Sequence, residues 1–473
     1  MSTRDLAAGQ RNRAGQRSSR RQAPAQHAGN GAGHRLRRRD YRGWHMVWAL
    51  SATETVAFGA LYYSFAVFLV PMRDAFDASP AALTGAFSVA LAVSGLAAPL
   101  VGRWLDRYGA RVVMTVGSAA ATIALVAWSA ANNLPQLYLA FILMGLAWAG
   151  VQYEPAFALI NRWFDRDRQS ALLTLTMVGG LASVIFVPLS QLLISILGWR
   201  EALLVLAAVA ALCGVVHLAV LRAAPASVGL AVDGAPRDAA PVETPPCRHT
   251  QRGPSPEGRG RLGEPAAGVG SSWRLPQVRW LTLATVAETA AVTIIAVHLV
   301  SYLQDSGSGP GTAAAAAGSL GIMSIAGRIF LTRAAARWSL ARVTAGIVGA
   351  QALGVAALHA LPRPADIVVF VVVFGAGFGV MTLARAALLG RYVPGQVFGR
   401  VSGRQALVVN AGRVAAPVAA GASITWTGDY AVLLISVALC TLAAAVALWR
   451  SDMAFRGRDS SSISNVHEGS TTS

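Results

Sequence analysis

Several ionisable side chains lie well inside long apolar stretches of the sequence, among them Arg328, Arg413, Glu54, Glu154, Glu288 and His298. A charged group at the centre of a bilayer costs about 2.5–3.5 kcal/mol on insertion scales, so such residues are candidates for a functional site. A guanidinium can bind a carboxylate through two parallel hydrogen bonds. A glutamate that alternates between a dry environment and the vicinity of an arginine can take up and release a proton. These residue types therefore indicate anion binding together with proton movement.

We predict that Arg328 and Arg413 contact an anionic substrate, either together as a site for a dianion or as one binding group and one helper. The alternatives are that Arg328 snorkels to the membrane edge and that Arg413 pairs with a buried glutamate. Arg385 lies near the end of its apolar stretch, where snorkelling is the favoured interpretation. Tyr62 and Tyr63 are predicted to line the substrate pocket; the alternative for them is packing or an interfacial aromatic belt.

Four residues are predicted to couple transport to protons. Glu54 and Glu288 are the first candidates, and Glu154 and His298 are the further ones. The alternative for Glu154 is a simple ion pair with Arg162. A histidine can titrate near neutral pH, and the alternative for His298 is a structural hydrogen bond to a backbone carbonyl.

The elements that must position these residues are apolar helices. The chain has 473 residues, of which 54% are hydrophobic and 13% charged, about half the charged share of a soluble domain. About 20 apolar residues suffice for a helix to cross a bilayer, and runs of this length do not fit barrel strands. We therefore predict an all-α integral membrane protein with twelve transmembrane helices. The windows are 46–70, 83–102, 112–131, 136–160, 170–195, 202–221, 278–303, 311–332, 343–361, 365–389, 405–426 and 430–449.

The distribution of arginine predicts the orientation of these helices. All 40 basic residues are arginines, and with a cytoplasmic N-terminus 34 of them lie in cytoplasmic tails and loops, three in external loops and three within spans. This is a strong positive-inside pattern. It predicts a multi-pass protein of the inner (plasma) membrane with both termini in the cytoplasm. The net charge of +18 is thereby explained by topology and lipid contact, and no nucleic acid is expected.

A Pro-, Gly- and Arg-rich segment divides the twelve windows six and six. We predict a disordered Arg-rich tail at 1–45, an N-terminal six-helix half at 46–222, a disordered cytoplasmic linker at 223–275, a C-terminal six-helix half at 276–450 and a cytoplasmic tail at 451–473. Met46 is an alternative start of the chain. Two equal halves around a site near the midplane suit transport by alternating access.

The loop between the second and third windows carries a recognisable motif, made of Gly102, Asp106, Arg107, Gly109 and Arg111. It resembles the signature loop of the major facilitator superfamily, Gly-x-x-x-Asp-Arg-x-Gly-x-Arg. The resemblance implies a conformational latch in which Asp106 caps a helix end or pairs with a base. The alternative is ordinary loop charge. The corresponding loop of the second half has Ala336 where an acid is expected, so the second latch is predicted to be weak or absent.

A finer resemblance rests on residues 62–71, 161–164, 198–200, 298–303 and 327–328. Together these segments are similar to the branch of monocarboxylate porters and oxalate/formate exchangers. That branch carries a base in span 8 that binds the substrate carboxylate, which corresponds to Arg328; Ser324 stands where the porters have an acid. The exchangers have bases in spans 8 and 11, which implies a role for Arg413 as well. By the same resemblance, spans 1, 4 and 7 line the cavity.

We therefore predict a secondary transporter that moves a small organic anion, a mono- or dicarboxylate, coupled to protons or to a counter-anion. The alternative is a drug or metabolite exporter on the same fold, working by proton antiport. Such exporters carry an arginine four residues before a glycine in span 4, where this chain has Phe141 and Gly145, and a Gly-Pro pair in span 5 that is missing here.

An enzyme is not expected, because the sequence contains none of the phosphate-binding, nucleophile-elbow or metalloprotease motifs. Three scattered cysteines give neither a disulfide framework nor a zinc site. No cofactor and no metal are expected, and we predict a monomer in the lipid bilayer. A sensor role is a third possibility on the same fold.

Overall fold

The computed structural model describes residues 41–234, 269–393 and 395–468. Within these ranges the regular structure is entirely helical. In the N-terminal half the elements are α1 (Arg42–Phe58), η1 (Gly59–Tyr63), α2 (Phe65–Phe76), α3 (Pro80–Ala130), α4 (Leu134–Val151), α5 (Tyr153–Trp163), α6 (Arg168–Gly179), α7 (Ala182–Leu197) and α8 (Trp199–Val220). In the C-terminal half they are α10 (Pro276–Asp305), α11 (Pro310–Ala335), α12 (Leu340–Ala360), α13 (Ala365–Gly377), α14 (Val380–Tyr392), α15 (Gly395–Thr427) and α16 (Ala431–Glu468).

The number of membrane crossings agrees with the predicted twelve. Eleven of the described helical segments are long and apolar enough to span a bilayer. One of them, α3, has 51 residues and would be roughly 77 Å long if straight, far more than one bilayer. Its backbone leaves the helical region at Gly109, with φ 78° and ψ 165°. Because α3 turns at this glycine, it supplies two crossings, and the all-α prediction of twelve is confirmed.

Several spans are interrupted near their middle. Span 1 contains a π-turn over Gly59–Tyr63, in which the Ser64 N–H donates to the Gly59 carbonyl across 2.9 Å. Span 4 breaks at Gln152, span 5 at Gly180 and span 10 at Gly379, where φ is 95°. Irregular backbone inside a membrane is tolerated where it is buried in protein or lines a cavity, so these breaks point to the functional centre.

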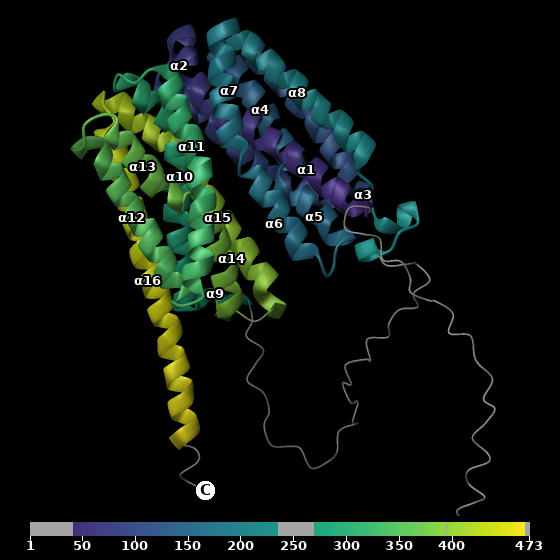
Figure 1. Ribbon diagram of the computed structural model, residues 1–473, viewed down its shortest axis with the longest axis vertical. Helices are drawn as coiled ribbons and strands as arrows, with labels where there is room; N and C mark the ends of the chain where they lie inside the picture. The colour runs from purple at the N-terminus through teal and green to yellow at the C-terminus, as the bar shows by residue number, and fades with distance from the viewer. Residues whose placement is uncertain (1–40, 235–268, 394, 469–473) are drawn as a thin grey trace, which may run out of the picture.

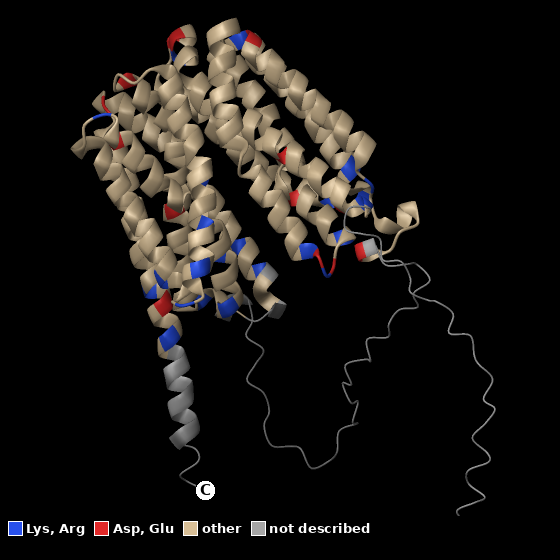
Figure 2. Cartoon of the chain, viewed as in Figure 1, with Lys and Arg blue, Asp and Glu red and all other residues tan. Residues whose placement is uncertain are grey.

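The two halves form two bundles side by side, joined at one end and splayed at the other (Figure 1). Arginines concentrate at the splayed end (Figure 2), which carries Arg103, Arg162, Arg333 and Arg342 and is called the basic face below. The other end, which carries Arg73 and Asp305, is called the opposite face.

The apolar cores explain the splayed shape. At the basic face, one cluster of buried side chains draws only on residues 41–221 and another only on residues 278–448. Toward the opposite face the cores mix. Ala66, Val67 and Val187 pack into the C-terminal core, and Val297 packs into the N-terminal one. The halves therefore share apolar packing at the opposite face.

The ends of the predicted linker and tails are partly helical. Short helices form at Pro225–Val228 and Val269–Arg274. The Asp233 carboxylate accepts hydrogen bonds from the backbone N–H groups of Asp165 and Arg166, which fixes the start of the linker to the loop after span 4. Residues 1–40, 235–268 and 469–473 lie outside the described residues, and so does most of the sequence predicted to be disordered. Helix α16 continues to Glu468, past the predicted end of the C-terminal half at residue 450.

Candidate substrate site

A cavity lies between the two halves, walled by span 2, the broken span 4 and span 11. Its empty space is about 720 Å³, including the part that is open to solvent. Its polar lining is Ser94, Gln152, Glu154, Asn410 and Arg413, and its other walls include Leu91, Leu105, Trp148 and Val414. Leu105 also belongs to the apolar cluster of the basic face. The cavity therefore extends from the middle of the bundle toward the basic face.

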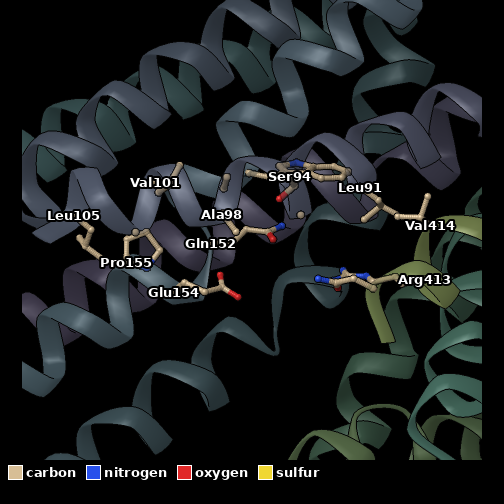
Figure 3. A pocket seen from close by; sticks show the side chains of 15 residues that line it. Leu91, Ser94, Ala98, Val101, Leu105, Gln152, Glu154, Pro155, Arg413 and Val414 are labelled. Carbon is tan, nitrogen blue, oxygen red and sulfur yellow. The ribbon is translucent and has the colours of Figure 1, made fainter. Parts of the chain in front are cut away.

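The break in span 4 places polar groups on the cavity wall. Helix α4 ends at Val151, Gln152 has an extended backbone with ψ −173°, and a new helix begins at Tyr153. The interruption turns the side chains of Gln152 and Glu154 into the cavity (Figure 3). Glu154 directly precedes Pro155 and Gln152 lies three residues before it, so the proline and the polar amide inside an apolar window were the sequence signals for this break.

Arg413 reaches the cavity from span 11. Its guanidinium carbon lies 5.0 Å from the centre of the Tyr62 ring, in cation–π geometry. No carboxylate of the described residues lies within ion-pairing distance of Arg413, so the alternative that it pairs with a buried glutamate is not found. An arginine that contacts an aromatic face and has no acidic partner is available for an anion.

The two predicted pocket tyrosines come from the π-turn of span 1. Tyr62 is buried and packs against Trp148, with ring centres 5.7 Å apart, while the Tyr63 ring lies 5.1 Å from that of Tyr62. Neither ring is among the cavity-lining residues. The Tyr62 ring therefore contacts both Arg413 and Trp148. Tyr63 extends toward the other half, where its ring centre lies 6.5 Å from that of Phe378 in span 10.

Arg328 occupies a different place. A Cβ atom added to Gly379 would lie 2.5 Å from one of its terminal nitrogens, and one added to Gly180 would lie 3.8 Å from the other. The guanidinium is thus seated between the breaks of spans 5 and 10, and its Nε has no hydrogen-bond partner. Arg328 therefore lies inside the bundle and does not snorkel to the membrane edge, which was the alternative for this residue. Arg328 is not among the residues that line the cavity with Arg413.

Glu154 is exposed to the cavity and faces Arg413 across it (Figure 3). The alternative of an ion pair between Glu154 and Arg162 is wrong, because Arg162 Nη2 lies 3.7 Å from an oxygen of Asp106 instead. The break after Val151 explains the difference, since it turns Glu154 toward the cavity, while Arg162 is exposed in the last turn of α5.

Glu54 and Glu288 are buried away from the cavity, and neither carboxyl has a hydrogen-bond partner among the described residues. Each is the thirteenth residue of its helix, counted from Arg42 and from Pro276, and each is followed by threonine. They thus hold equivalent positions in the two halves. Burying an unpaired carboxylate is costly unless the group carries a proton.

His298 lies on the side of the opposite face. Its Nε2 is 3.2 Å from the Pro417 carbonyl oxygen, which matches the structural alternative for this residue. It shares a small pocket with Arg73, Ser301 and Tyr430 and does not line the cavity.

The predicted latch joins spans 2 and 3 of the N-terminal half to spans 4 and 6. Asp106 pairs with Arg162 at the end of span 4, and Arg111 Nε donates to the Leu218 carbonyl at the end of span 6, across 2.9 Å. Gly109 adopts the positive φ that makes the turn possible. Gly102 lines the cavity, and Arg107 lies over the Tyr108 ring at 5.3 Å. The contacts of Asp106 and Arg111 thus remain within one half.

An ion-pair network at the opposite face was not foreseen from the sequence. Arg73, at the end of span 1, donates to both carboxylate oxygens of Asp305, at the end of span 7, at 3.0 and 3.3 Å. The Tyr430 hydroxyl donates to the same carboxylate at 2.8 Å, and burial together with this carboxylate raises the pKa of Tyr430. These groups link the two halves where the sequence showed only isolated loop charges.

Residues 54–382 match the model of the Major Facilitator Superfamily. Monocarboxylate transporter 13 of Bos taurus is 30% identical over 290 residues, which cover 61% of this chain and 60% of that protein. Monocarboxylate transporter 11 of Homo sapiens is 33% identical over 168 residues, 35% of each chain. The matches thus span about 60% and 35% of the lengths of these relatives.

Solved structures with the same fold are more distant in sequence. The nucleoside transporter NupG superposes with a TM-score of 0.66 at 14% identity, covering 86% of this chain and 99% of that one. A bacterial homologue of the human lysosomal transporter Spinster, in an inward-facing and occupied conformation, gives a TM-score of 0.63 at 16% identity, covering 87% of this chain and 97% of that one.

Proposed function

This chain belongs to the major facilitator superfamily, and we propose that it moves a small organic anion, a mono- or dicarboxylate, across the membrane by alternating access. The observation that carries the proposal is Arg413, a cation without an acidic partner on the wall of a cavity between the two halves. A guanidinium in this setting binds a carboxylate in preference to a neutral or cationic solute. The similarity to monocarboxylate transporters supports the same substrate class.

The orientation of the transporter follows from the arginines. We place the basic face in the cytoplasm, so that both termini are cytoplasmic and the chain lies in the plasma membrane. The cavity then opens inward and the Arg73–Asp305 network closes the outer side. We expect the monomer to be the transporting unit, since each site is formed by the two halves of one chain.

Coupling to protons or to a counter-anion completes the proposal. Glu54 and Glu288 are buried without partners, which is the environment that a proton-carrying carboxyl group occupies in its protonated state. Glu154 faces the cavity. His298 is a proton candidate for the outer side only, because it lies beside Arg73 and Tyr430. Arg328 is the second anion-binding candidate, reached when spans 5 and 10 move apart.

The proposal is tested by uptake of labelled lactate, oxalate and formate into proteoliposomes, with and without a pH gradient. Arg413→Ala is expected to lower uptake by about tenfold or more, the scale of a hydrogen bond to a charged group, and Arg413→Lys should retain part of it. Arg385→Ala is the matched control, since Arg385 also lies in a span but outside the cavity. Uptake by Arg413→Ala equal to that of the unmodified chain would contradict the assignment.

A further inference from the structure

The two walls of the cavity carry opposite charges that do not neutralise each other. Arg413 projects from span 11 and Glu154 from span 4, and their charged ends face each other across open space (Figure 3). No ion pair joins Arg413 and Glu154, because neither side chain takes part in an ion pair with any described residue at a nitrogen–oxygen distance up to 4 Å. An arginine and a glutamate that could pair but are held apart leave room for a molecule between them.

Unused hydrogen-bond donors lie at the arginine end. Trp148 is 1% exposed, and its indole N–H has no partner. It packs against the same Tyr62 ring that lies beneath Arg413. The amide nitrogen of Gln152 is also buried without a partner, and both residues line the cavity. Buried donors without partners are rare in folded proteins, and here they surround the place where a carboxylate would meet Arg413.

The charges of the lining limit what can occupy the rest of the cavity. Among the described residues that line the cavity, Arg413 is the basic one and Glu154 the acidic one, so the formal net charge of the walls is zero. A second carboxylate on the substrate would be repelled by Glu154, and the repulsion is strong where water is excluded. A cationic or hydrogen-bond-donating group at that end would instead be attracted.

We propose that the substrate is a monocarboxylate whose far end carries an amino group, bound by Arg413 at the carboxylate and by Glu154 at the ammonium. This proposal rests on the transport function proposed above and modifies its substrate class: the carboxylate that binds Arg413 is kept, but the ammonium group makes the substrate a zwitterion without net charge at neutral pH. It excludes dicarboxylates, and it gives Glu154 a role in substrate binding in place of proton transfer, which is left to Glu54 and Glu288.

The test compares acids that differ at one end only. Purified full-length chain in proteoliposomes is given 4-aminobutyrate, butyrate or succinate, and the same set with three and six carbons. We expect one chain length to show uptake of the amino acid at least about tenfold above its dicarboxylate, as for loss of a charge-assisted hydrogen bond. Glu154→Gln should remove this preference by lowering uptake of the amino acid and raising that of the dicarboxylate. Glu201→Gln, which changes an exposed acid outside the cavity, should leave the ratio unchanged.

The outcomes separate the two proposals. If unsubstituted or dicarboxylic acids are taken up and amino acids are not, the substrate class is wrong and the transport function stands. If Glu154→Gln abolishes the response of uptake to a pH gradient, Glu154 is a proton site, and its assignment to substrate binding is overturned. If neither the nine acids nor lactate, oxalate and formate are taken up by correctly folded chain, checked by size-exclusion chromatography in detergent, the proposed function itself fails.

Discussion

At the opposite face the two halves share apolar packing and an ion-pair network, whereas at the basic face each half packs only against itself. The first arrangement closes the space between the halves, and the second leaves the cavity open. The ion pair in this closure is weak. The side chains of Arg73 and Asp305 are 36% and 32% exposed, and an ion pair of this kind contributes about 0–1 kcal/mol. An ion pair of this strength can be broken and remade in each transport cycle.

Ion pairs inside a half belong to a different class. Arg342 lies 2.9 Å from Asp452, and Asp106 lies 3.7 Å from Arg162, in each case within one half. Such pairs can persist while the halves rock against each other as rigid bodies. The comparison therefore separates contacts that must break during transport from contacts that need not.

The largest expected effect comes from making the closure permanent. In a chain without its own cysteines, Arg73→Cys and Asp305→Cys are joined by a short bifunctional thiol reagent. We expect uptake to fall to the level of empty liposomes, because the halves can no longer separate at the opposite face. The measurement is uptake before and after cross-linking.

The matched control joins two residues of the same half. Arg342→Cys and Asp452→Cys replace an ion pair of 2.9 Å at the basic face, and cross-linking them should leave uptake nearly unchanged. Normal transport by the Arg73–Asp305 cross-linked chain would show that this contact does not open.

A smaller effect is expected from removing the ion pair. Arg73→Ala should shift the population toward the conformation open at the opposite face by up to about fivefold, the range for a partly exposed pair. The shift is measured by placing a cysteine in the cavity, Ser94→Cys, and labelling it with an impermeant reagent from each side. The exchange of charges, Arg73→Asp with Asp305→Arg, should restore the original ratio. An equal shift in the exchanged chain would mean that the charges themselves are not responsible.

The smallest effect is expected from Tyr430→Phe. It removes the 2.8 Å hydrogen bond to Asp305 but leaves the pair with Arg73 intact. Because Asp305 is partly exposed, water can replace the hydroxyl, and we expect a shift below about twofold, read out with the same cysteine. A shift larger than that of Arg73→Ala would make the tyrosine the main contact of the closure.

The spans were predictable because the bilayer imposes their composition, and the arginine pattern then gave their alternation. The residues at which the helices begin and end were less predictable. Helices such as Arg42–Phe76 and α16 extend beyond the apolar windows because hydropathy reports the thickness of the lipid, not the length of the helix. Arg413 and Glu154 were found as charges in apolar surroundings. Their placement on opposite walls depends on the break at Gln152, and backbone interruptions leave little trace in composition.

Other parts of the site depend on contacts between distant segments. Trp148 resembles a packing residue in the sequence, and its unpartnered N–H becomes visible only when its neighbours are known. Arg73 and Asp305 are 232 residues apart, and each is an ordinary loop charge until the two halves are assembled. Glu54 and Glu288 were predicted as buried acids, and their equivalence in the two halves is clear only from the helix starts.

The π-turn of span 1 has a consequence for the angular phase of that helix. One residue beyond the regular count is accommodated between Gly59 and Tyr63, and one residue corresponds to about 100° of rotation about a helix axis. The segment below the turn, with Glu54, and the segment above it, with Arg73, are therefore offset in the direction that they face. In an uninterrupted helix the Arg73 side chain would point away from Asp305. The π-turn therefore lets Glu54 face the N-terminal half while Arg73 faces the C-terminal half.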